Sequence, residues 1–139
     1  MAVQRYRTQF PQHVLDEIFP KERTDRFFEA LLGDASDGAF DIILTYTGES
    51  ENRIEFEFQL KQRPGRCLAC NLTYGLPEVF ARHPVIDIAG IVQQIDSRMT
   101  NGNRCGRWHI GRTKEISRER HALPLVIDLL PGHSTHQEN

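Results

Sequence analysis

Two segments in which apolar and polar residues alternate limit the fold more than any other feature of this chain. In residues 54–61 the apolar positions are Ile54, Phe56, Phe58 and Leu60. Residues 40–46 show a similar alternation, and the polar stretch 48–52 separates the two segments. A period of two predicts strands with one buried face and one solvated face. We therefore expect an antiparallel hairpin whose outer face carries Glu55 and Glu57.

The residues before this hairpin have helical spacing. Apolar residues from Pro11 to Phe19 recur on one helical face, and Pro20 interrupts the pattern. A second helix is predicted to run to Leu32, with Thr24 as an N-cap. Gly33 stands where a helix commonly ends in a left-handed glycine.

The second half of the chain repeats the order of helices and then strands. Leu76 and Pro77 begin a short predicted helix that ends before Pro84, and residues 85–99 have the spacing of a longer one. After the turn signal at 101–103, residues 107–116 and 123–130 are predicted strands, joined by a charged turn at 117–121.

These elements predict an α+β fold. The expected order is two helices, two strands, two helices and two strands, forming a single antiparallel β-sheet with the helices packed on one face. The length of 139 residues predicts a single domain over residues 1–139. We expect flexible ends at 1–9 and 131–139, since both are polar and lack periodicity.

Composition and charge indicate a cytoplasmic protein. The chain has 39% hydrophobic residues, three cysteines and a net charge of −2. It has no signal-peptide pattern, no apolar run long enough for a membrane span, and too few cysteines for a secreted disulfide scaffold. The first 60 residues carry six basic and twelve acidic side chains, whereas the remainder carries eleven and seven. We expect these two halves to lie against each other in the fold.

The most suggestive chemical feature is the C-x-x-C pair Cys67 and Cys70. Two thiolates at this spacing can bind one zinc ion, for which Cys105 would be the third ligand and His83, His109 or His121 the fourth. The same spacing also suits a reversible disulfide, and buried free cysteines commonly serve only as small apolar residues. In an extended segment, Cys105 and His109 would be about 13 Å apart, so they share a metal only if Gly106 bends the chain.

A basic stretch follows in residues 104–120. Its candidate anion-binding residues are Arg107, Trp108, Arg112 and Lys114. Phosphate contacts and aromatic stacking on a sheet are typical of single-strand binding. Strand alternation, however, separates Arg107 and His109 from the other three, so we expect a solvated strand face rather than a nucleic-acid site.

The leading hypothesis from sequence is a non-enzymatic binding domain for a small molecule or a protein partner, with a C-x-x-C loop held by zinc. No sequence signature of a hydrolase, kinase or nucleotide-binding enzyme is present. The first alternative is a thiol-redox protein that uses Cys67 and Cys70. A weaker alternative is an anion or nucleic-acid contact through residues 104–120. An edge strand that pairs across a homodimer is also left open.

Overall fold

The computed structural model describes residues 6–67, 75–100 and 102–131. It is a mixed helix and strand fold with one antiparallel sheet, as predicted. The elements are α1 (Gln12–Ile18), α2 (Lys21–Leu32), the short 3-10 helix η1 (Ala35–Asp37), β1 (Phe40–Glu49), β2 (Arg53–Gln62), α3 (Leu76–Arg82), α4 (Ile88–Arg98), β3 (Asn103–Ile110), β4 (Lys114–Ser117) and β5 (Arg120–Pro131).

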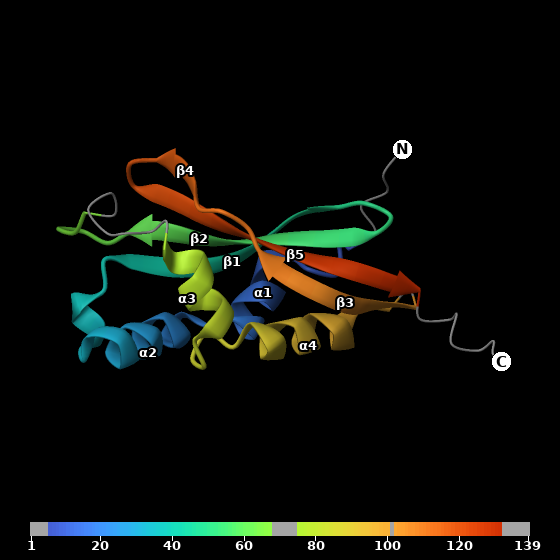
Figure 1. Ribbon diagram of the computed structural model, residues 1–139, viewed down its shortest axis with the longest axis horizontal. Coiled ribbons are helices and arrows are strands. Elements are labelled where there is room, and N and C mark those ends of the chain that lie inside the picture. The colour runs from blue at the N-terminus through green and yellow to red at the C-terminus, as the bar shows by residue number, and fades with distance from the viewer. Residues whose placement is uncertain (1–5, 68–74, 101, 132–139) are drawn as a thin grey trace.

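The sheet is organised around the long strand β5. The strand order is β1-β2-β5-β3, and β4 also pairs with β5. One side of β5 therefore pairs with β2, and the other side pairs with β4 near its start and with β3 further along. Figure 1 shows this sheet above α1, α2 and α4, with α3 running down from the level of the sheet.

The predicted strand at 107–116 is two strands, which corrects the expected order of elements. β3 begins earlier, at Asn103, and ends at Ile110, and β4 starts at Lys114. The break follows the residue opposite Pro124. Gly111 donates its backbone N–H to the Pro124 carbonyl at 2.8 Å. Proline has no N–H to donate in return, so the ladder weakens there and the chain leaves β5.

The alternating pattern of β2 forms the centre of the core, as predicted. The side chains of Ile54, Phe56, Phe58 and Leu60 are fully buried. The ring of Phe58 lies 5.7 Å from that of Phe19 at the end of α1 and 5.3 Å from that of Phe80 on α3. These contacts join the middle of the sheet to both halves of the helical layer.

The described part of the segment 1–9, which was expected to be flexible, contacts the rest of the fold. Tyr6 is fully buried, and its backbone N–H donates to the Glu49 carboxylate at 2.7 Å. The centre of the Tyr6 ring lies 6.4 Å from that of Phe10. Tyr6 thus anchors the start of the described chain, although it is not part of a periodic apolar pattern. The other residues of the predicted ends, 1–5 and 132–139, lie outside the described residues.

The start of α4 differs from the prediction, whereas the end of α2 agrees with it. α4 starts at Ile88 rather than near Val85, because Asp87 caps it by accepting from the Gly90 N–H at 3.1 Å. Gly33 ends α2 with a φ of 92°, as predicted. Within the described residues, no helix combines the length and apolar character that a membrane crossing requires.

Thr24 is not the N-cap of α2, since the helix already begins at Lys21. It is fully buried, and its hydroxyl accepts from the Ile42 N–H at 3.3 Å and donates to the Ile42 carbonyl at 3.4 Å. The Gln12 amide donates to the Leu44 carbonyl at 2.8 Å. Side chains of α1 and α2 thus bind the outer edge of β1, which protects that edge from pairing with another chain.

We expect Thr24→Val to lower the free energy of unfolding by about 1–3 kcal/mol, because the buried N–H and C=O of Ile42 lose their partner while the side-chain volume is retained. Urea denaturation monitored by circular dichroism measures this. Thr47→Val, at an exposed position of the same strand, is the control and should change stability by less than about 0.5 kcal/mol. Equal effects of the two substitutions would contradict a role for the Thr24 hydroxyl.

Candidate functional site

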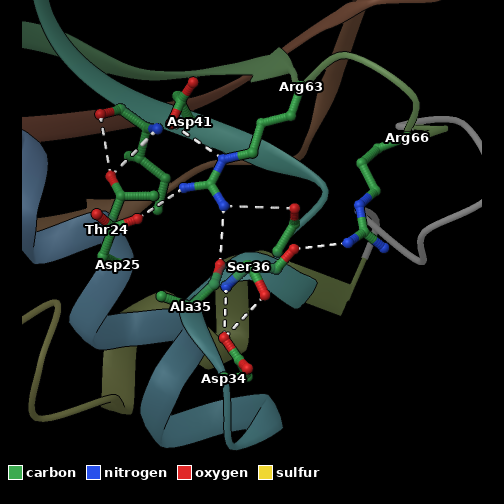
Figure 2. A network of polar contacts seen from close by, with 10 residues as sticks. Thr24, Asp25, Asp34, Ala35, Ser36, Asp41, Arg63 and Arg66 are labelled. Atoms are coloured by element: carbon green, nitrogen blue, oxygen red, sulfur yellow. Dashed lines mark hydrogen bonds and ion pairs between the residues drawn. The ribbon is translucent and has the colours of Figure 1, made fainter.

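The candidate site begins where β2 ends, at Arg63. Its guanidinium binds Asp41 on β1 at 3.1 Å, Asp25 on α2 at 3.0 Å and the Ala35 carbonyl of η1 at 2.9 Å (Figure 2). It also lies 5.4 Å from the centre of the Phe28 ring. Arg63 therefore fixes the end of β2 to three other elements and sets the path of the chain toward Cys67.

Cys67 lies on the surface just beyond this network. Gly65 turns the chain with a φ of 75°, and Arg66 donates to the Ser36 carbonyl at 2.6 Å (Figure 2). Cys67 is exposed and forms a disulfide bond. It borders a depression of about 200 Å³, and Cys70 lies outside the described residues.

Cys105 is in a different environment. It is a free thiol on β3, and its sulfur lies 3.6 Å from the Met99 sulfur. Its backbone N–H donates to the Asp96 carboxylate at 2.7 Å. Burial, together with the negative charge of Asp96, raises the pKa of the Cys105 thiol to about 12. The thiol is therefore protonated at neutral pH.

Cys67 and Cys105 are at opposite ends of β5. Gln62 precedes the turn that leads to Cys67, and its N–H donates to the carbonyl of Glu119, the residue before the first residue of β5, Arg120. Cys105 pairs instead with Leu129, near the other end of β5. Nine positions of a strand at about 3.3 Å each separate those two points of β5 by roughly 30 Å. One metal ion cannot contact both sulfurs, so a zinc ion at Cys67 would need other ligands than Cys105.

The three histidines proposed as ligands are also dispersed, and one of them, His121, is buried on β5. His83 follows α3, packs 4.9 Å from the Phe27 ring, and accepts the Val85 N–H at its Nδ1 atom. His109 is exposed on β3. An irregularity in the pairing between Cys105 and Trp108 places Cys105 with the core and leaves His109 on the outer face. Sequence spacing alone had not placed them on opposite faces.

Zinc binding at the C-x-x-C pair stays a prediction. In the described part of the chain, no group of three or more His, Cys, Asp or Glu side chains is arranged to bind a metal. Zinc binds cysteine as thiolate. Since Cys67 is in a disulfide, zinc could bind its thiolate only after that bond is reduced.

We expect Cys105 in the Cys67→Ser/Cys70→Ser variant to react with iodoacetamide at pH 8 roughly a thousandfold more slowly than in the unfolded chain, because only the thiolate is nucleophilic. Asp96→Asn, which keeps an oxygen for the Cys105 N–H, should speed the reaction. The folded thiol retains its proton to a higher pH than the unfolded one. Its contribution to stability is thus complete below about pH 8.5 and declines as the pH rises toward 12. Alkylation at the rate of the unfolded chain would contradict this burial.

The predicted anion-binding residues do not share one surface. Arg107 is exposed on the outer face, whereas Trp108 is partly buried and packs against the core. Lys114 is paired with Glu57 at 3.2 Å. Arg112 lines a separate recess. Strand alternation had predicted that these residues would divide between two faces.

Sequence reasoning missed the outer edge of β3, which no other strand among the described residues covers. The backbone N–H of Gly111 and the backbone N–H and C=O of His109 point toward β5. Because these groups alternate in direction along a strand, those of Trp108 and Ile110 point away from β5. The Cys105 N–H is bound to Asp96, which leaves the end of β3 as the open part of this edge. The sequence pointed to this edge only through Pro124, which lacks an N–H and so limits how far β3 can pair with β5.

A recess of about 680 Å³ adjoins this open edge. Its walls come from the first turn of α3 and from the segment between β3 and β4, and are formed by Pro77, Glu78, Ile110, Gly111, Arg112 and Thr113. Its volume is in the range of ligand-binding sites. Backbone hydrogen-bonding groups and a recess for side chains therefore lie side by side.

Comparisons with known proteins do not assign this site. No protein-family model, curated protein or solved structure matches the chain.

Proposed function

We propose that this protein is a non-catalytic binding domain that adds an extended acidic segment of a partner protein to the edge of β3. The observation that supports this most directly is the open end of β3. There the N–H and C=O groups of Trp108 and Ile110 face away from the sheet, next to a recess of about 680 Å³. Strand addition uses such backbone groups for affinity and side-chain pockets for specificity.

The alternation of an added strand defines the sequence it would have. Side chains on the helical side would enter the recess beside Pro77 and Ile110, which favours small apolar residues. Side chains on the other face would lie near Arg107 and His109, which favours carboxylates. The proposed partner segment therefore alternates apolar and acidic residues.

Charge favours an acidic partner over a second copy of this chain. Residues 103–114 contain four cations and no carboxylate. Two of them, Arg107 and Arg112, have no ion pair with any described residue. Pairing of β3 with itself would bring two such segments together, and like charges on neighbouring strands are destabilising.

The proposal is tested with a short synthetic peptide in which glutamate alternates with valine. We expect the backbone amide signals of Trp108 and Ile110 to shift on titration with this peptide. The same peptide with methylated valine amides should not cause these shifts, because it cannot form the ladder. Binding of both peptides to the same extent, or shifts confined to other parts of the chain, would contradict strand addition.

Two variants of Ile110 distinguish the contribution of its backbone N–H to peptide binding from that of its side chain. Ile110→Pro removes the outward N–H but leaves the ladder to β5, since proline is tolerated at such edge positions. Ile110→Val keeps the N–H. We expect the proline variant to lose peptide binding and the valine variant to retain it. Circular dichroism confirms that each variant is folded before the titration.

The exposed disulfide of Cys67 favours a second candidate function, that of a thiol-redox protein. Arg66 and Arg118 line the same depression as Cys67. In thiol–disulfide exchange, an incoming thiolate bonds to one sulfur, the S–S bond breaks, and the other sulfur leaves as a thiolate that these cations would stabilise. A second thiolate of the reductant then releases the first sulfur, so that two electrons enter the protein.

Equilibration with glutathione buffers, followed by thiol counting, tests this function. A redox-active pair would titrate within the glutathione range, and Cys67→Ser would abolish the transition. Elemental analysis of the reduced protein distinguishes the zinc hypothesis, which requires one zinc ion per chain. A disulfide that stays intact in the most reducing buffer would argue against the redox function.

A further inference from the structure

Four cations gather where β2 meets the hairpin of β4 and β5, and we call this group the cationic end. Its members are Lys61, Arg66, Arg118 and Arg120, and all four side chains are exposed. Lys61 and Arg120 are directly opposite each other on β2 and β5. Residues in such positions have Cβ atoms about 5 Å apart, and like charges there repel each other. The fold thus holds positive charges close together at this end.

None of these cations forms an ion pair with a described residue. Asp41 lies opposite Lys61 on the other side, but its carboxylate is bound by Arg63 at 3.1 Å. Arg66 uses one nitrogen to bind the Ser36 carbonyl, which fixes its position and leaves its other donors available (Figure 2). By contrast, Arg63, Arg98, Arg104 and Lys114 each have a carboxylate partner.

Two adjoining depressions lie among these cations. One, of about 200 Å³, is lined by Arg66 and Arg118, and the other, of about 330 Å³, by Lys61 and Arg120. Gln62 and Glu119 line both depressions, and the Gln62 N–H donates to the Glu119 carbonyl at 2.8 Å. Each depression therefore presents two cations to whatever occupies it.

We infer that the cationic end binds a small molecule that carries two phosphate groups, one in each depression. Arginine donates paired hydrogen bonds that match phosphate oxygens, and lysine adds a point charge. A phosphate monoester carries a charge of about −1.5 to −2 at pH 7. Two such groups carry a total charge of about −3 to −4, which balances the net positive charge left by the four cations and the Glu119 carboxylate.

This site is separate from the one proposed for a protein partner. The recess beside β3 shares no lining residue with either depression. Loss of binding at the cationic end would therefore leave the peptide titration at Trp108 and Ile110 unchanged. The two proposals can fail independently.

Calorimetric titration of the full chain with inorganic pyrophosphate tests the inference, with orthophosphate as the single-phosphate comparison. We expect pyrophosphate to bind at least about tenfold more tightly than orthophosphate. Lys61→Gln and Arg118→Gln, one from each depression, should each weaken pyrophosphate binding by about tenfold or more. Arg82→Gln removes an exposed cation on α3 and is the matched control, which should bind as the unmodified chain does.

Three outcomes would overturn the inference. Pyrophosphate could bind no more tightly than orthophosphate, which would exclude two cooperating depressions. Arg82→Gln could weaken binding as much as Arg118→Gln, which would indicate general attraction by the basic half. A single-stranded oligonucleotide could bind in a way that depends on Lys61 and Arg118 while pyrophosphate does not, which would assign the cations to a polymer backbone.

Discussion

Replacing Phe58 with alanine is expected to lower the free energy of unfolding by about 3–5 kcal/mol. The Phe58 side chain is fully buried at the centre of β2 and packs edge-on against Phe19 and Phe80. Alanine would leave a cavity where β2 now contacts Phe19, at the end of α1, and Phe80 on α3. Urea denaturation followed by circular dichroism measures the change.

The neighbouring residue provides the control. Gln59 is on the same strand but faces outward, so Gln59→Ala should change stability by less than about 0.5 kcal/mol. If the two substitutions destabilised the protein equally, the assignment of the two faces of β2 would be wrong. If Phe58→Ala cost less than Gln59→Ala, β2 would be shifted by one residue in the sheet.

Replacing Arg63 with alanine is expected to lower the free energy of unfolding by about 2–3 kcal/mol. The Arg63 side chain is only 16% exposed and binds Asp25, Asp41 and the Ala35 carbonyl. Removing it leaves those groups without their shared partner and opens the contact with Phe28. The estimate is below that for a fully buried ion pair because Asp25 is 51% exposed and remains hydrated.

Arg63→Lys tests whether geometry or charge matters. Lysine keeps the positive charge but cannot reach two carboxylates and a carbonyl with one planar group, so most of the loss should persist. Chemical denaturation of both variants measures this. Full stability of the lysine variant would show that charge alone is sufficient. Arg98→Ala, which removes a surface pair with Glu17 at 3.7 Å, is the control and should cost less than about 1 kcal/mol.

The hairpin of β1 and β2 was predictable because its signal is local. Alternation in residues 40–46 and 54–61 requires one buried face, and a shift by one residue would expose Phe56 and Phe58. The register of Ile42 with Leu60 and of Leu44 with Phe58 follows from this requirement. The glycine at the end of α2 was predictable for the same reason, since a left-handed residue is a local demand.

The candidate site was much less predictable. The C-x-x-C spacing suggested that Cys105 would join Cys67, but the pairing of β3 with the far end of β5 holds them apart. The irregularity after Cys105 puts Cys105 and His109 on opposite faces of β3, and no local pattern signals such a shift. The basic stretch was recognised, yet its members act at different places. Arg107 lies on β3 and Arg112 lines the recess beside it, whereas Arg118 and Arg120 lie near Lys61 on β2 and Arg66 in the turn after β2.

The sequence by itself determined the fold class, the central hairpin and most helix positions, because burial of apolar side chains at fixed periods decides them residue by residue. Only the tertiary structure decided which strand is left open, which cations lie together and which thiol is buried. Those properties depend on contacts between segments far apart in the chain, such as Arg63 with Asp25 and Gln62 with Glu119. Their energies come from pairing and desolvation between elements, and no single stretch of sequence carries that information.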